Sequence, residues 1–141
     1  IEDVKEKREL GPDALDLERD DFIGILEDKR GSLKSTLMNQ KYICGIGNIY
    51  ADEILFQAGF DPRSVPKKMN RKELKKLYGK MRKVLTTAVE KNVTPENFPS
   101  NFLLGRREEG EKCPRCRGTI KKITISGRSA YLCPKCQEKI S

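Results

Sequence analysis

The chain has 141 residues and a formal net charge of +8, and it contains no histidine. A length of this order fits one domain or two small ones. No apolar run approaches the roughly 18 residues needed to cross a bilayer, which excludes a membrane-spanning protein. The lack of histidine excludes every mechanism that needs an imidazole base, and it means that a zinc site would have to rely on thiolates.

The opening segment 1–6 is polar and acidic, unlike a secretory signal. The chain also begins at Ile1 rather than at methionine, so we expect a piece of a longer protein. We expect that protein to act inside the cell.

The positive charge is concentrated in two segments of the chain. Residues 66–92 carry a net charge of +8 and residues 113–141 carry +6, whereas residues 1–65 carry −5. Such basic segments favour a polyanionic partner, of which DNA and RNA are the commonest. The alternative is a lysine-rich helix face that contacts only water and binds no partner.

Three short helices are expected before residue 60. Apolar residues at i, i+3 and i+4 predict a helix within residues 16–29. Ser32 is suited to cap a second helix, because its hydroxyl can accept a hydrogen bond from a free backbone N–H. A third helix is expected from Ile49, and Gly59 followed by Pro62 is the usual order of residues at a helix end.

The longest predicted helix runs from about residue 70 to residue 92. Its apolar residues form one stripe, so its lysines must line the opposite face. The stripe consists of Leu74, Leu77, Tyr78, Met81, Val84, Leu85, Ala88 and Val89. Residues 93–112 contain prolines and glycines and are expected to form a linker.

Four cysteines form the most specific motif of the sequence. Two Cys-x2-Cys pairs are separated by sixteen residues, a spacing within the range of tetrahedral four-cysteine zinc sites. Four thiolates leave no open coordination position, so the predicted Zn²⁺ is structural. Metal binding would supply much of the folding energy of a segment that lacks an apolar core of its own. The predicted ligands are Cys113, Cys116, Cys133 and Cys136.

The residues between the two cysteine pairs are β-prone and predict a hairpin with Arg128 near its tip. Two disulfides or a redox pair are the alternative to zinc. A fifth cysteine and the absence of a secretory signal favour a reducing compartment, and therefore zinc.

Three further motifs are Leu10-Gly11-Pro12, Leu37-Met38-Asn39-Gln40 and Gly45-Ile46-Gly47-Asn48-Ile49-Tyr50-Ala51-Asp52-Glu53. Together with the four-cysteine ribbon, they resemble the carboxy-terminal half of the formamidopyrimidine-DNA glycosylase/endonuclease VIII family. The resemblance covers about residues 10–141. It implies a mainly α fold, in which a helix-two-turn-helix bundle is followed by a small four-cysteine zinc-ribbon β-hairpin.

The resemblance also implies a division of the chain into parts. Residues 1–9 would be a remnant of an upstream domain or a linker, and residues 10–92 the helix-two-turn-helix DNA-binding domain. Residues 93–112 would link this domain to the zinc finger, residues 113–141.

Four residues are expected to contact DNA if the resemblance holds. Gly47 lets the backbone approach a phosphate at the start of a helix, where the free N–H groups and the side-chain amide of Asn48 can bind the anion. Arg128 matches a zinc-finger arginine that contacts phosphate near the flipped nucleotide. Lys34 aligns with a lysine that approaches the lesion strand, although its helical position alone predicts a solvated side chain.

The resemblance implies base-excision repair, in which a DNA glycosylase removes oxidised bases and then cleaves the abasic site as an AP lyase. The partner would be double-stranded DNA carrying an oxidised base or an abasic site, and the protein would act in the cytoplasm or at the nucleoid. Family members use an amino-terminal proline as the amine that attacks the sugar. The catalytic domain that begins with this proline is not recognisable here, so we expect the chain to be non-catalytic by itself and to contain no catalytic residue. We also expect no lysine to be buried enough to act as a free amine.

Two other interpretations fit the sequence. A stand-alone nucleic-acid-binding zinc-ribbon module, bound to RNA or the ribosome, would share the basic charge and the four cysteines. A protein-interaction domain that uses zinc only for folding would share the cysteines alone.

Overall fold

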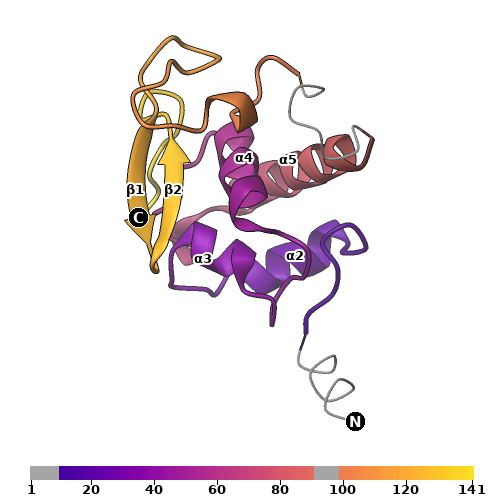
Figure 1. Cartoon of the computed structure of the whole chain (residues 1–141). Helices are drawn as coiled ribbons and strands as arrows, with labels where there is room; N and C mark the ends of the chain where they lie inside the picture. The colour runs from indigo at the N-terminus through magenta and orange to yellow at the C-terminus, as the bar shows by residue number, and fades with distance from the viewer. Residues whose placement is uncertain (1–9, 91–98) are drawn as a thin grey trace.

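The computed structural model describes residues 10–90 and 99–141 (Figure 1). A helical module contains α2 (Arg19–Leu26), α3 (Leu33–Met38), α4 (Asn48–Ala58) and α5 (Arg71–Glu90), with the short 3₁₀ turn η1 (Pro66–Lys68) before α5. A second turn, η3 (Leu104–Arg106), leads to the hairpin of β1 (Lys121–Ile125) and β2 (Arg128–Leu132). The expected fold class, mainly α followed by a small zinc-ribbon hairpin, is confirmed. In the described ranges, no helix is both long and apolar enough to span a membrane.

The helix ends follow the local signals of the sequence. Ser32 caps α3 by accepting a hydrogen bond from the N–H of Ser35 at 3.2 Å. Gly59 ends α4 in the left-handed conformation, with φ +83°, which disfavours residues with a Cβ. At the start of α5, the side chains of Asn70 and Glu73 each accept the other's backbone N–H at 2.8 Å, forming a capping box.

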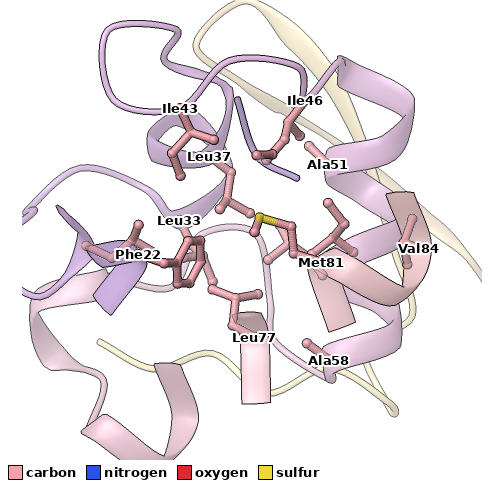
Figure 2. Packing of buried hydrophobic residues seen from close by; sticks show 14 of the residues in the cluster. Phe22, Leu33, Leu37, Ile43, Ile46, Ala51, Ala58, Leu77, Met81 and Val84 are labelled. Atoms are coloured by element: carbon pink, nitrogen blue, oxygen red, sulfur yellow. The ribbon is translucent and has the colours of Figure 1, made fainter. Parts of the chain in front are cut away.

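The helices enclose one hydrophobic core (Figure 2). Side chains of Phe22 from α2, Leu37 from α3 and Met81 from α5 meet in its interior, and each is fully buried. The stripe predicted on α5 faces this core through Leu74, Leu77, Met81, Val84, Leu85 and Ala88, while Val89 is exposed. Burial of apolar surface is therefore the main source of stability for the helical module.

After its first turn, helix α4 is buried on every side. All residues from Ala51 to Ala58 are buried, including the polar side chains of Asp52, Glu53 and Gln57. A buried charge is costly unless it is paired and hydrogen-bonded, so these side chains must have partners on neighbouring segments. Those partners lie on α3, on the segment after residue 99 and on the ribbon, which places α4 at the centre of the molecule.

The hairpin has the antiparallel register Ile125↔Arg128, closed by a two-residue loop. The loop residues Ser126 and Gly127 both have positive φ, as a type I′ turn requires. Arg128 is the first residue after this loop, so its predicted place near the tip is confirmed.

The ribbon is attached to the helical module through its carboxy-terminal residues. The N–H of Asp61 donates to the carbonyl of Glu138 at 2.8 Å, and the N–H of Val65 donates to that of Ile140 at 2.7 Å. Part of the expected linker also packs inward, because Phe102 and Leu103 are buried. Residues 91–98, which include the start of that expected linker, lie outside the described residues.

Candidate nucleic-acid interface and zinc site

The four predicted zinc ligands converge in the structure. Their sulfur atoms lie within 4.8 Å of one another, and the Cys113–Cys136 and Cys116–Cys133 sulfurs are 3.7 and 3.4 Å apart. All four cysteines are free thiols, so the alternative of two disulfides is not what the structure shows. Four soft ligands at this separation fit one tetrahedral Zn²⁺.

A backbone hydrogen bond favours the metal-binding form of Cys116. The N–H of Gly118 donates to the Cys116 sulfur at 3.3 Å, and this hydrogen bond is the largest of several contributions that lower the pKa of the Cys116 thiol to about 7, whereas burial raises the pKa of Cys133 and Cys136. Thiolates, rather than thiols, bind metal. A Cβ at Gly118 would lie 3.1 Å from the Cys116 sulfur and 3.4 Å from the Cys133 sulfur, so a side chain here would crowd the ligands.

The glycine-rich turn before α4 is open to solvent. Gly45 and Gly47 are exposed, and Gly45 has φ +98°, a conformation suited to glycine. Gly47 is the residue before the first turn of α4, and the first N–H groups of a helix have no partner within it. The turn thus presents backbone donors and the positive end of the helix dipole at one exposed point.

Asn48 and Lys34 converge on one carbonyl group of the ribbon. Asn48 Nδ2 donates to the carbonyl oxygen of Ser129 at 3.2 Å, and Lys34 Nζ donates to the same oxygen at 2.8 Å. Ser129 follows Arg128 directly in β2. Asn48 and Lys34 are thereby brought next to the strand that begins with Arg128, and Gly47 directly precedes Asn48.

The predicted solvation of Lys34 is wrong. Its side chain is only 1% exposed, and Nζ forms an ion pair with Asp52 Oδ1 at 2.7 Å. Burial lowers the pKa of Lys34 and raises that of Asp52, while the ion pair opposes both shifts. The expectation that no lysine is buried is also wrong, and the Asp52 carboxylate only partly offsets the lowering of the Lys34 pKa by burial.

Asp52 joins three parts of the chain. Its Oδ2 atom accepts from Arg107 Nε at 2.9 Å and from the N–H of Tyr131 at 3.3 Å, while Oδ1 faces Lys34. The Arg107 guanidinium also stacks over the Tyr131 ring, with 4.6 Å to the ring centroid. One carboxylate thus links α3, the segment after η3 and β2.

A cleft of about 280 Å³ lies between α3 and the hairpin. Its lining residues are Lys34, Ser35, Met38, Asn39, Ile125, Ser126 and Arg128. The hydroxyl groups of Ser35 and Ser126 lie 2.9 Å apart and close one wall. Arg128 is exposed and Lys34 is buried, so the free guanidinium can meet an anionic partner while the amine supports the wall.

A second buried network lies further along α4. Glu53 accepts the backbone N–H groups of Leu103 and Leu104 at 2.9 and 2.8 Å, and it also accepts from Gln57 Nε2 at 2.8 Å. Gln57 Oε1 in turn accepts from Arg115 of the ribbon at 2.6 Å.

Sequence reasoning assigned no role to Asp52, Glu53 or Arg107. A signal for the first two was present, because the adjacent acidic residues precede the apolar run Ile54-Leu55-Phe56 in a helix without a polar face. Acidic residues in such a helix must find buried partners. Nothing in the local sequence identifies Arg107 as one of them.

Comparisons with known proteins cover nearly all of the described chain. Residues 10–98 match the formamidopyrimidine-DNA glycosylase H2TH domain, and residues 110–139 match the zinc finger found in FPG and IleRS. The second match agrees with the converging thiolates, so the cofactor of this chain is one structural Zn²⁺.

Curated relatives and solved structures agree with these matches. The formamidopyrimidine-DNA glycosylase of Solibacter usitatus is 34% identical over 140 residues, covering 92% of this chain and 53% of the relative. A formamidopyrimidine-DNA glycosylase-like protein of Mycobacterium tuberculosis is 36% identical over 138 residues, covering 92% of this chain and 85% of the relative. A Lactococcus lactis Fpg complexed with DNA that contains an abasic site has a TM-score of 0.81 at 27% identity, covering 94% of this chain and 53% of that one.

The chain spans about half the length of the Solibacter and Lactococcus proteins, and most of the length of the mycobacterial one. The H2TH match alone covers more than half of its residues. The chain therefore belongs to the formamidopyrimidine-DNA glycosylase family.

Proposed function

We propose that this chain is the damaged-DNA-binding half of a base-excision-repair DNA glycosylase/AP lyase that removes oxidised bases. The observation that carries the proposal is the hydrogen bond from Asn48, at the α4 amino terminus, to the carbonyl of Ser129, the residue that follows the exposed Arg128 in β2. These groups form one cationic, donor-rich surface across the two parts of the molecule. The partner would be double-stranded DNA carrying an oxidised base or an abasic site, which places the expected action at the nucleoid.

Each predicted residue has a physical role in this proposal. The exposed turn at Gly47 and the amide of Asn48 would donate hydrogen bonds to a phosphate of the lesion strand. Arg128 would bind a neighbouring phosphate, because a planar guanidinium matches phosphate oxygens and the zinc-braced hairpin restricts its motion. Lys34 would contribute positive charge from behind the cleft and one remaining N–H donor, since two are used by Asp52 and Ser129.

The residues of this chain supply no catalytic amine in this proposal. Schiff-base formation at an abasic site needs an unprotonated amine, and the buried Lys34 lies in an ion pair with Asp52 at 2.7 Å, which favours the ammonium form. Base removal and strand cleavage would then depend on residues of a catalytic domain that this chain does not supply.

A competition experiment tests the DNA-binding proposal. The zinc-loaded chain is titrated, at one salt concentration, with a duplex containing an abasic-site analogue, the same duplex intact, and an RNA duplex of equal length. We expect the abasic duplex to bind tightest. Tighter binding of RNA would instead support the stand-alone RNA-binding module, and no binding to any of the three would support the protein-interaction domain.

Borohydride trapping on abasic-site DNA tests the catalytic part of the proposal. We expect no efficient covalent adduct. An adduct formed at substoichiometric protein and lost in a Lys34→Met variant would show that this chain holds an active amine.

A further inference from the structure

We propose that Asp52, a residue buried away from any DNA contact, positions Arg128 for phosphate binding by fixing Lys34 and β2. The inference rests on the proposed function, because it concerns how the DNA-binding surface is assembled. Asp52 would act as a positioning residue, since it acts only through other groups.

Asp52 directly contacts α3 and β2, the two elements that border the cleft. Lys34, on the α3 wall, is paired with Oδ1 at 2.7 Å, and the backbone N–H of Tyr131, three residues after Arg128 in the strand that borders the other wall, donates to Oδ2 at 3.3 Å. Because the side chain of Asp52 is fully buried, no water competes for these contacts.

The chain of contacts continues to the hairpin tip. Lys34 has four rotatable side-chain bonds, and its ion pair with Asp52 selects the conformation that donates to the Ser129 carbonyl at 2.8 Å. Asp52 therefore fixes the backbone on both sides of Ala130, through Ser129 and Tyr131. Arg128 is the residue next to the first of these points, on a hairpin that has only two strands to hold it.

The arrangement gives Arg128 a defined place relative to Asn48. Asn48 Nδ2 binds the same Ser129 carbonyl at 3.2 Å, so the α4 phosphate site and the hairpin site share one anchor atom. Preorganised donors lose less conformational entropy when the ligand binds. Loosening the anchor should therefore reduce the contribution of Arg128 to DNA affinity, even though Arg128 itself is unchanged.

The test is a double-mutant cycle on the zinc-loaded chain. Affinity for the abasic-site duplex is measured for wild type, Asp52→Asn, Arg128→Ala and the double variant. Asp61→Asn is the matched control, because Asp61 is also a buried aspartate in an ion pair, with Arg63 at 2.8 Å, but its carboxylate accepts hydrogen bonds from Arg63 rather than from Lys34 or the hairpin. Zinc content and melting temperature are recorded for every variant.

We expect Asp52→Asn to weaken DNA binding roughly tenfold, and to have little further effect once Arg128 is alanine. Asp61→Asn should lower the melting temperature and leave the affinity unchanged. An unchanged affinity of Asp52→Asn overturns the inference. So does an equal weakening in both backgrounds, because a merely structural loss would not depend on Arg128.

Arg107→Ala keeps the inference testable if Asp52→Asn does not fold. Arg107 is partly exposed and contributes one of the hydrogen bonds of Asp52, so its removal should give a smaller weakening with the same dependence on Arg128. An unchanged affinity in this variant likewise overturns the inference. Absence of DNA binding by the wild type would instead refute the proposed function, which distinguishes the two failures.

Discussion

The helical module and the zinc ribbon are stabilised by different physical means. The helical module buries a continuous cluster of apolar side chains drawn from four helices. The cluster under the ribbon has five buried residues, Phe56, Leu103, Cys113, Ile120 and Cys133, two of which are zinc ligands. The first region can fold by burial of apolar surface, whereas the second depends on its metal and on the surface that it contacts.

This difference matters for the proposed DNA-binding surface, because the surface is assembled from both regions. Asn48 belongs to the helical module and Arg128 to the ribbon, and they are joined through the Ser129 carbonyl. Four predictions, ordered by expected effect, test how far the two regions are separable.

Zinc removal should affect the ribbon most strongly. Chelation, or the Cys133→Ala/Cys136→Ala variant, should unfold residues 113–141, because structural zinc contributes about 10 to 16 kcal/mol of apparent binding free energy. The circular dichroism of the helices should change little, while DNA affinity should be lost. Metal analysis of fresh protein should give one zinc per chain. Less than about half an equivalent, or zinc retained by the double variant, would contradict the assignment.

Leu77→Ala should affect the helical module instead. Leu77 is fully buried in the core, and truncating such a leucine costs about 2 to 5 kcal/mol of unfolding free energy. We expect a lower melting temperature with the zinc stoichiometry unchanged. Lys75→Ala, on the exposed face of the same helix, is the control and should change stability by less than about 0.5 kcal/mol. Loss of zinc in Leu77→Ala would show that the two regions fold as one unit.

The contrast between the regions also explains what the sequence could predict. Ser32, Gly59 and the Ser126-Gly127 turn act through their own local backbone, so the helix ends and the hairpin followed from the sequence. The zinc ligands were recognisable because their spacing is local to each pair.

The buried ion pair of Lys34 was not predictable in the same way. Lys34 and Asp52 lie on different helices, and their pairing depends on how α3 packs beside α4 and the hairpin. Arg107, the other ion-pair partner of Asp52, is even further from it in the sequence, on the segment expected to be a linker. Polar contacts of this kind follow from tertiary placement, which periodicity and capping rules do not contain.

Two asparagines at helix starts should separate affinity from stability. Asn48→Ala should weaken binding to the abasic-site duplex by about 1 to 3 kcal/mol, because it removes a proposed phosphate donor and a contact with Ser129. Asn70→Ala removes the cap of α5 and should cost about 0.5 to 2 kcal/mol of stability with unchanged affinity. Fluorescence anisotropy and thermal melts measure the two quantities. If both variants had the same affinity for the abasic-site duplex, Asn48 would not be a DNA contact.

The smallest expected effect is on the pH dependence of the unfolding free energy. Glu53 contributes to it where α4 contacts the segment that leads to the ribbon. Burial raises the pKa of Glu53 above its ordinary value, although hydrogen bonds from Gln57, Leu103 and Leu104 oppose the shift. The folded chain therefore binds this proton more tightly than the unfolded chain. The stability that the proton contributes is present below the unfolded pKa of about 4.3, and it is lost as the pH rises through the raised folded pKa.

A comparison with Glu53→Gln isolates that contribution. The unfolding free energy of wild type relative to Glu53→Gln should increase as the pH falls from about 7.5 toward 5. Urea unfolding at both pH values gives the difference, from which the titration of the zinc ligands cancels because both proteins contain them. A difference that is constant with pH, or that changes in the opposite direction, would contradict the direction of the Glu53 shift.

The central claim is that the helical module and the ribbon together bind the phosphates of DNA. The salt dependence of DNA binding tests this claim most directly. The affinity of the zinc-loaded wild type and of Arg128→Ala for the abasic-site duplex is measured over a severalfold range of salt, with Lys122→Ala, an exposed residue of β1, as the control for charge. The logarithm of the association constant should fall linearly with the logarithm of salt concentration, and Arg128→Ala should reduce the slope by about one, more than Lys122→Ala does. An affinity that stays constant as salt rises, or equal slopes for wild type and Arg128→Ala, would contradict the account.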